Sequence, residues 1–158
     1  MKIKNLANDS MREVKFEHIS DAYFLYWNMY LKYRKYEFNQ GEIPAYFILD
    51  NIFSSFLVEI GLKALAVYEN KQIKNNHNLD YLFNQLSLEM QNIVAKESNI
   101  ELIELKEKLK KNAEHFQHWR YYYELKADSF NIKLFEKLLT IITALLEVLR
   151  GKQINTNN

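Results

Sequence analysis

Hydrophobic side chains in this chain recur at three- and four-residue steps, the spacing that places them on one face of a helix. The first segment with this pattern, residues 18–35, carries Ile19, Ala22, Tyr23, Tyr26, Met29, Tyr30 and Tyr33. Gly41 then interrupts the pattern, and Pro44 stands where proline is best tolerated, in the first turn of a helix. The sequence therefore predicts one helix over 18–35 and a second that begins at about residue 44.

Two long segments, 44–69 and 130–150, are apolar almost all round. A helix without a wide polar face usually lies at the centre of a bundle. Because a single domain of this size rarely buries two such helices completely, we expect a second copy of the chain to cover part of their surface. A symmetric homodimer is the commonest arrangement of this kind.

Shorter helices are expected between these two segments. Asn78 can cap a helix that ends at about residue 86, and Ser87 can cap another that ends at about residue 96. Ser98 and Glu101 have the spacing of a capping box and predict the start of a charged helix. Lysines in that helix alternate with glutamates, which favours a solvated face over a basic patch.

Length and composition favour a single all-α domain. The chain has 158 residues, enough for one sizeable core, with only three glycines and one proline, which argues against a hairpin-rich β fold. We expect an antiparallel bundle of about five or six helices over residues 1–158, with its core at about 18–150 and flexible ends at 1–11 and 151–158.

Charge and cysteine content exclude several classes of function. The net charge is +1, so no global field attracts nucleic acid or an anionic membrane, and any RNA contact must be local. The absence of cysteine excludes disulfides, thiolate zinc sites and cysteine nucleophiles. With no secretory signal, and with the apolar stretch 138–149 too short to span a membrane, we expect a cytoplasmic protein without a membrane anchor. No motif indicates a cofactor.

Glu59 and Lys63 lie four residues apart in the otherwise apolar segment 44–69. An isolated charge is costly in such a position, so both side chains need partners. The simpler interpretation is a mutual ion pair. The alternative makes the two residues the floor of a polar groove that faces His77 and Arg120.

Arg120 is followed by Tyr121, Tyr122, Tyr123 and then Glu124, which stands four residues after the arginine and can pair with it. A guanidinium can bind a phosphate with two hydrogen bonds, and a tyrosine ring can stack on a base. The cluster therefore has the chemistry of a nucleotide or RNA site. The alternative is an aromatic core seam with a stabilising arginine.

His115 and His118 stand three residues apart, so their imidazoles can share one helix face. Two histidines do not make a metal site without a third ligand, and we expect no metal there. Upstream of Arg120, these histidines could instead supply proton transfer next to a bound phosphate.

Three segments together resemble the HEPN family: 59–65 (Glu-Ile-Gly-Leu-Lys-Ala-Leu), 77–82 (His-Asn-Leu-Asp-Tyr-Leu) and 119–124 (Trp-Arg-Tyr-Tyr-Tyr-Glu). The family consists of small all-helical domains, many of them RNA-cutting toxins or antiviral effectors and others non-catalytic binding modules. The resemblance implies that His77 chiefly latches the loop to the helix that carries Glu59.

The nuclease branch of the family carries an arginine, four to six intervening residues and a histidine, one such pair per subunit meeting across a dimer. After Arg120, the corresponding positions hold leucine, lysine and alanine. Arg12 and His18 match the spacing only by coincidence, because the family motif belongs near the later helices. The resemblance thus implies a possible metal-independent endoribonuclease but does not supply its usual catalytic motif.

Two functions remain open from the sequence. The first is a HEPN-like protein of the bacterial defence or toxin–antitoxin type that binds or cleaves RNA, and that also contacts an antitoxin or another protein. In this function Arg120, His115 and His118 are the catalytic candidates, and the neighbouring tyrosines with Glu124, Glu59, Lys63 and His77 form the binding site. The second is a non-enzymatic nucleotide-binding or protein-interaction module of the same fold.

Overall fold

A computed structural model describes residues 14–35, 43–73, 76–113 and 132–156. These ranges are helical apart from short connections, and they contain no β-strand. The helices are α1 (Phe16–Arg34), α2 (Ile43–Tyr68), α3 (Leu79–Gln85), α4 (Leu88–Glu97), α5 (Leu102–Lys111) and α7 (Ile132–Thr156). The predicted all-α bundle is therefore confirmed.

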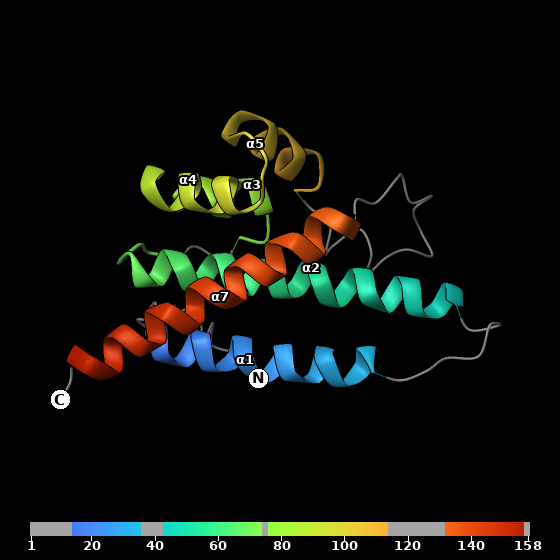
Figure 1. Cartoon of the computed structure of the whole chain (residues 1–158), viewed down its shortest axis with the longest axis horizontal. Coiled ribbons are helices and arrows are strands. Elements are labelled where there is room, and N and C mark those ends of the chain that lie inside the picture. The colour runs from blue at the N-terminus through green and yellow to red at the C-terminus, as the bar shows by residue number, and fades with distance from the viewer. Residues whose placement is uncertain (1–13, 36–42, 74–75, 114–131, 157–158) are drawn as a thin grey trace, which may run out of the picture.

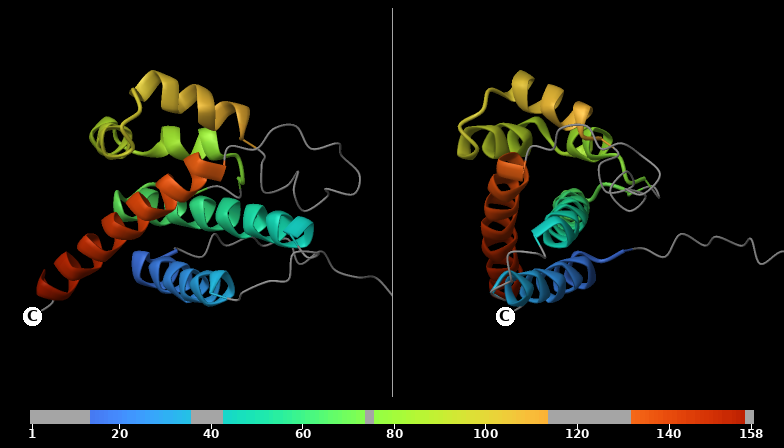
Figure 2. Two further views of the ribbon diagram at one scale, coloured as in Figure 1. Left: turned by 45° about the vertical axis from the view of Figure 1, so that its right-hand side comes forward. Right: turned by 90° about the vertical axis from the view of Figure 1, so that its right-hand side faces the viewer.

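The α2 helix lies between α1 on one side and a layer of α3, α4 and α5 on the other (Figure 1). The ring of Phe16 at the start of α1 packs edge-on against Tyr68 at the end of α2, so the two helices run antiparallel. The α7 helix crosses α2 obliquely in the same general direction and also contacts α1 and α4 (Figure 2). Helix α2 is thus covered from three sides, as a helix without a polar face requires.

The apolar side chains of α2 and α7 form most of the core. Among the fully buried ones are Leu57, Leu62, Leu65, Phe135, Leu138 and Leu139. Within the described parts of these two helices, the large apolar side chains that stay exposed are Leu49 and Val148. Within the described residues, the packing of one chain alone already covers most of this surface. The homodimer itself stays a prediction.

Helix α2 packs tightly against α7 at Gly61. A Cβ atom added there would lie 2.3 Å from Cγ2 of Ile142 and 3.1 Å from a ring carbon of Tyr23. Nearby, the hydroxyl of Tyr23 lies 2.7 Å from that of Thr143, inside the core. The bundle thus depends on a residue without a side chain at this crossing.

Two predicted helix caps are confirmed and a third is wrong. Asn78 accepts a hydrogen bond from the backbone N–H of Tyr81, and Ser87 accepts one from that of Met90. Ser98, by contrast, ends α4 and donates to the carbonyl of Ala95, while α5 begins only at Leu102. The turn after Ser98 contains Asn99 in the left-handed region with φ 50°, so Ser98 cannot open the next helix.

The predicted boundaries shift at both ends of the domain. Helix α1 begins at Phe16 instead of residue 18, and α7 continues through Gly151 to Thr156, so residues 151–156 are not the loose end that was expected. Gly151 is exposed and a Cβ there would touch nothing within 4 Å, which shows that the helix passes this position without strain. Residues 1–11 lie outside the described residues.

One segment of α2, Leu49–Tyr68, is long and apolar enough to cross a membrane by length and composition alone. The expectation of no membrane anchor rested on residues 138–149 alone. Of this α2 segment, 61% is buried inside the bundle, so its apolar character also meets the needs of a core helix.

Candidate functional site

The structure places three of the predicted site residues together and does not describe the others. Arg120, Glu124, the tyrosines at 121–123 and the histidines at 115 and 118 all lie outside the described residues. Glu59, Lys63 and His77 lie within them and are in direct contact, and we call these three residues the Glu59 cluster.

A single carboxylate oxygen holds the Glu59 cluster together. Oε1 of Glu59 lies 2.7 Å from Nζ of Lys63, one helical turn further along α2, and 2.8 Å from Nδ1 of His77. The side chain of Glu59 is only 3% exposed, whereas that of Lys63 is 15% and that of His77 is 40% exposed. The cluster therefore runs from the core to the surface, and the predicted ion pair between Glu59 and Lys63 is present.

The backbone around His77 is fixed by hydrogen bonds. The side chain of Asn76 accepts from the N–H of Asn78, and Asn78 in turn caps α3. The N–H of Leu79 donates to the carbonyl of Ala113 over 2.8 Å, which joins the start of α3 to the residue that follows α5. Leu79, two residues after His77, is fully buried. The backbone next to His77 is therefore anchored in the core, while the His77 side chain bonds to Glu59.

Ala113 is the last described residue before 114–131, and its bond to Leu79 places it beside the Glu59 cluster. The last turn of α5, just before this point, carries three basic residues, Lys108, Lys110 and Lys111. Lys108 pairs with Glu104 over 2.7 Å, while Lys110 and Lys111 are exposed. The prediction of a charged, solvated helix face is correct, and two exposed cations stand two and three residues before Ala113, which bonds to the start of α3.

A second charged cluster was not predicted from the sequence. Arg34, at the end of α1, donates to Asp50 on α2 over 2.7 Å and to Glu136 on α7 over 3.1 Å. Asp50 is buried, and burial together with this carboxylate raises the pKa of the nearby Tyr30 far above its ordinary value. The one signal in the sequence was an acidic residue in an apolar helix, and its partner Arg34 could not be identified without the tertiary structure.

This second cluster ties three helices together at one end of the bundle. Since the guanidinium of Arg34 already serves two carboxylates, a structural role explains its contacts. No group of three histidine, cysteine or acidic side chains with the geometry of a metal site occurs within the described residues.

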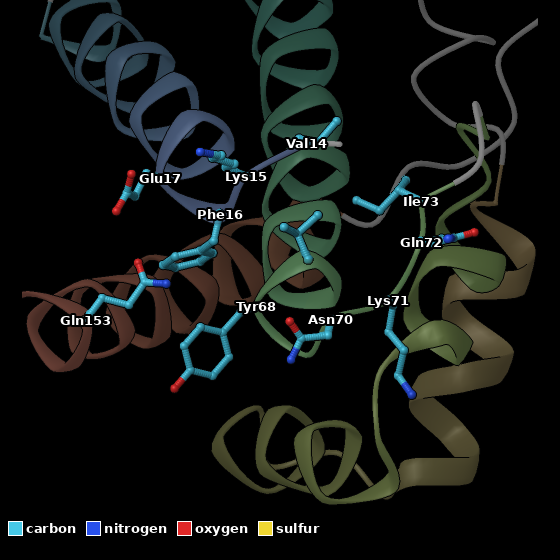
Figure 3. Close-up of a pocket in the computed structure, with 11 residues that line it drawn as sticks. Val14, Lys15, Phe16, Glu17, Tyr68, Asn70, Lys71, Gln72, Ile73 and Gln153 are labelled. Atoms are coloured by element: carbon cyan, nitrogen blue, oxygen red, sulfur yellow. The ribbon is translucent and has the colours of Figure 1, made fainter. Parts of the chain in front are cut away.

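A pocket of about 710 Å³ lies elsewhere, between the start of α1, the end of α2 and the late part of α7 (Figure 3). Phe16 and Tyr68 form its aromatic part, and Lys15 and Lys71 lie on its rim. Of the predicted site residues that the structure describes, Glu59, Lys63 and His77, none lines this pocket. We therefore take the Glu59 cluster, and not this pocket, as the candidate site.

No protein-family model, curated protein or solved structure matches this chain.

Proposed function

We propose that this chain is a HEPN-like helical protein of the bacterial defence or toxin–antitoxin type that binds or cleaves RNA. The observation that carries the proposal is the contact between Glu59 and His77. These residues belong to two separate segments of the HEPN-like pattern, and a functional resemblance requires that such segments meet. The leucines of the same segments, Leu62, Leu65 and Leu79, are buried in the core beside them.

The path of the chain supports a role for Arg120 near this cluster. Ala113 contacts Leu79, and the segment with His115, His118 and Arg120 follows within a few residues. In the proposed site the guanidinium of Arg120 binds an RNA phosphate, while the tyrosines at 121–123 stack on bases and Glu124 orients the arginine. The exposed lysines at the end of α5 add the local positive charge that the net charge of +1 does not provide.

If the protein cleaves RNA, the reaction needs a group that takes the proton of the attacking 2′-hydroxyl and a group that stabilises charge on the phosphate. Arg120 supplies the second. His115 and His118 precede it in the sequence and are the proposed proton-transfer residues, in place of the histidine that the family motif places after the arginine.

The alternative function is a non-enzymatic nucleotide-binding or protein-interaction module. It is favoured by two apolar side chains that lie one turn apart on one face of α1, Leu25 and Met29, which are 61% and 50% exposed. Such a surface can bind a second copy of the chain, an antitoxin or another protein. In either function we propose a cytoplasmic protein and a homodimer.

The test is incubation of the purified protein with a mixed pool of cellular RNA, without added metal and with EDTA. Arg120→Ala should lower cleavage by about 10²–10³-fold, the usual effect of removing one group that stabilises the transition state. Arg150→Ala is the matched control, because Arg150 lies on α7 and pairs there with Asp21. The Arg150→Ala variant should cleave RNA at the wild-type rate.

Equal loss in both arginine variants would indicate unfolding and not a site at Arg120. If the wild-type protein leaves RNA intact, the binding module becomes the better function. Fluorescence anisotropy with single-stranded RNA then decides whether the ligand is RNA: binding that weakens with salt and is lost in Arg120→Ala supports it, and absence of binding leaves a protein partner.

A further inference from the structure

We infer that His77 is a general base for RNA cleavage and that Glu59 is the positioning residue that fixes the protonation of its imidazole. The inference rests on the proposed nuclease function, and it replaces His115 and His118 by His77 as the group that accepts the proton. It starts from the two short contacts of one oxygen atom, Oε1 of Glu59.

The contacts determine where the protons lie. The ammonium of Lys63 has only donors, so Oε1 of Glu59 accepts from it and is an oxygen without a proton. An oxygen without a proton can only accept, so Nδ1 of His77 is the donor of the second hydrogen bond. In the neutral imidazole, Nε2 therefore carries the lone pair.

The position of the ring suits a base. The side chain of His77 is 40% exposed although its partner Glu59 is almost completely buried. Nε2 has no hydrogen-bond partner among the described residues. A buried carboxylate that holds Nδ1–H and leaves Nε2 open to a substrate is the arrangement by which hydrolytic triads orient their histidine.

A purely architectural latch explains this arrangement less well. Burying an ionised carboxylate is costly even when it is paired, and neutral side chains of similar size would join the loop to α2 without that cost. Oε2 of Glu59 is buried and has no hydrogen-bond partner within the described residues, so the cost is not fully offset.

The proposed step is a transesterification within RNA. Nε2 of His77 takes the proton of a ribose 2′-hydroxyl, the 2′-oxygen forms a bond to the adjacent phosphorus, and the bond from phosphorus to the 5′-oxygen breaks. The imidazolium then returns its proton, through a water molecule, to the leaving 5′-oxygen. The products are a 2′,3′-cyclic phosphate and a 5′-hydroxyl, and no electrons are exchanged.

The central variant is His77→Asn, because the asparagine amide can still donate to Glu59 from near the position of Nδ1 but has nothing at the position of Nε2. We expect it to lower the cleavage rate of the mixed RNA pool by about 10²–10⁴-fold, with a melting temperature close to that of the wild type. His18→Asn is the matched control, because His18 is exposed on α1, and it should leave the rate unchanged.

Three further measurements separate a base from a latch. Added imidazole should restore part of the activity of His77→Ala, which a structural loss would not permit. ¹⁵N NMR of the wild-type histidines should show one ring with Nδ1 protonated and Nε2 unprotonated. In Glu59→Gln this tautomer preference should weaken and the cleavage rate should fall, while His77 remains in place.

The outcomes distinguish this inference from the proposed function. Cleavage by the wild type that persists in folded His77→Asn would overturn the role of His77 and leave the nuclease function standing. If His77→Asn does not fold, absence of rescue of His77→Ala by imidazole overturns the inference in the same way. If the wild type produces no cyclic-phosphate ends from RNA, the nuclease function fails and the base role fails with it.

Discussion

The substitution Gly61→Ala tests the helix crossing on which the bundle depends. The added Cβ would lie 2.3 Å from Cγ2 of Ile142, well inside van der Waals contact, and 3.1 Å from the ring of Tyr23. Neither neighbour can move away easily, because both side chains are fully buried and Tyr23 is hydrogen-bonded to Thr143. Helices α2 and α7 must therefore separate to accept one methyl group.

The expected loss follows from two opposing effects. Overpacking of a rigid core costs about 1–3 kcal/mol, and a short contact with a branched side chain favours the upper end. Replacing glycine by alanine within a helix returns about 1 kcal/mol. We therefore expect Gly61→Ala to lower the free energy of unfolding by about 2 kcal/mol. At about 2–4 °C per kcal/mol for a chain of this length, the melting temperature falls by about 4–8 °C.

Far-UV circular dichroism during heating and denaturant titration measures both quantities. Gly151→Ala is the matched control: it lies in α7, a Cβ there meets nothing within 4 Å, and the change should stabilise by up to about 1 kcal/mol. The two glycines should thus respond with opposite signs. In an Ile142→Ala background, which lacks the clashing methyl, Gly61→Ala should become neutral or stabilising.

The reasoning is refuted if Gly61→Ala stabilises the wild-type protein as Gly151→Ala does. It is also refuted if the loss of about 2 kcal/mol persists in the Ile142→Ala background, because the contact with Ile142 would then not be its cause.

Three other predictions follow from individual contacts. Burial raises the pKa of Tyr23 above its ordinary value of about 10, so the folded state holds this proton more tightly than the unfolded state does. The contribution of this group to the free energy of unfolding is therefore complete below pH 10 and falls as the pH rises beyond it. Tyr23→Phe should therefore lose about 1 kcal/mol near neutral pH and show a shallower alkaline decline in urea titrations; an unchanged slope above pH 10 would contradict this cause. Arg34→Met leaves the buried carboxylate of Asp50 without its cation and should lose about 1–3 kcal/mol in the same titrations, whereas Arg150→Met, whose ion pair is exposed, should lose less than about 1 kcal/mol. If the exposed apolar side chains of α1 form the homodimer contact, Leu25→Asp should convert a dimer into a monomer in light scattering coupled to size-exclusion chromatography, and a dimer that survives the change places the contact elsewhere.

The local parts of this structure could be predicted because they depend on neighbours in the sequence. The three- and four-residue steps identify α1, α2 and α7, and the side chains of Asn78 and Ser87 reach backbone groups three residues away. Ser98 shows the limit of such reasoning. It has the right residue three positions later for a capping box, yet the chain turns at Asn99 before the next helix can start.

The candidate site was predictable only in part. Glu59 and Lys63 pair as their spacing implies, since both lie on one turn of a single helix. Periodicity gave no indication that His77 would share the same oxygen, and the resemblance to the HEPN family implied only that His77 latches its loop to this helix. For the contact of Arg34 with Asp50 and Glu136, the sequence showed only an acidic residue in an apolar helix and not its partner, because the contact joins residues from three helices.

The sequence by itself thus determined that this protein is helical and which of its helices are apolar enough to be central. Only the tertiary structure decided which helices enclose α2, that Gly61 packs against Ile142 of α7, and that Nδ1 of His77 bonds to the buried carboxylate of Glu59. The physical reason is the distance along the sequence over which each interaction acts. Helix formation and capping act over three or four residues, whereas burial, close approach and charge pairing depend on which distant segments fold against each other.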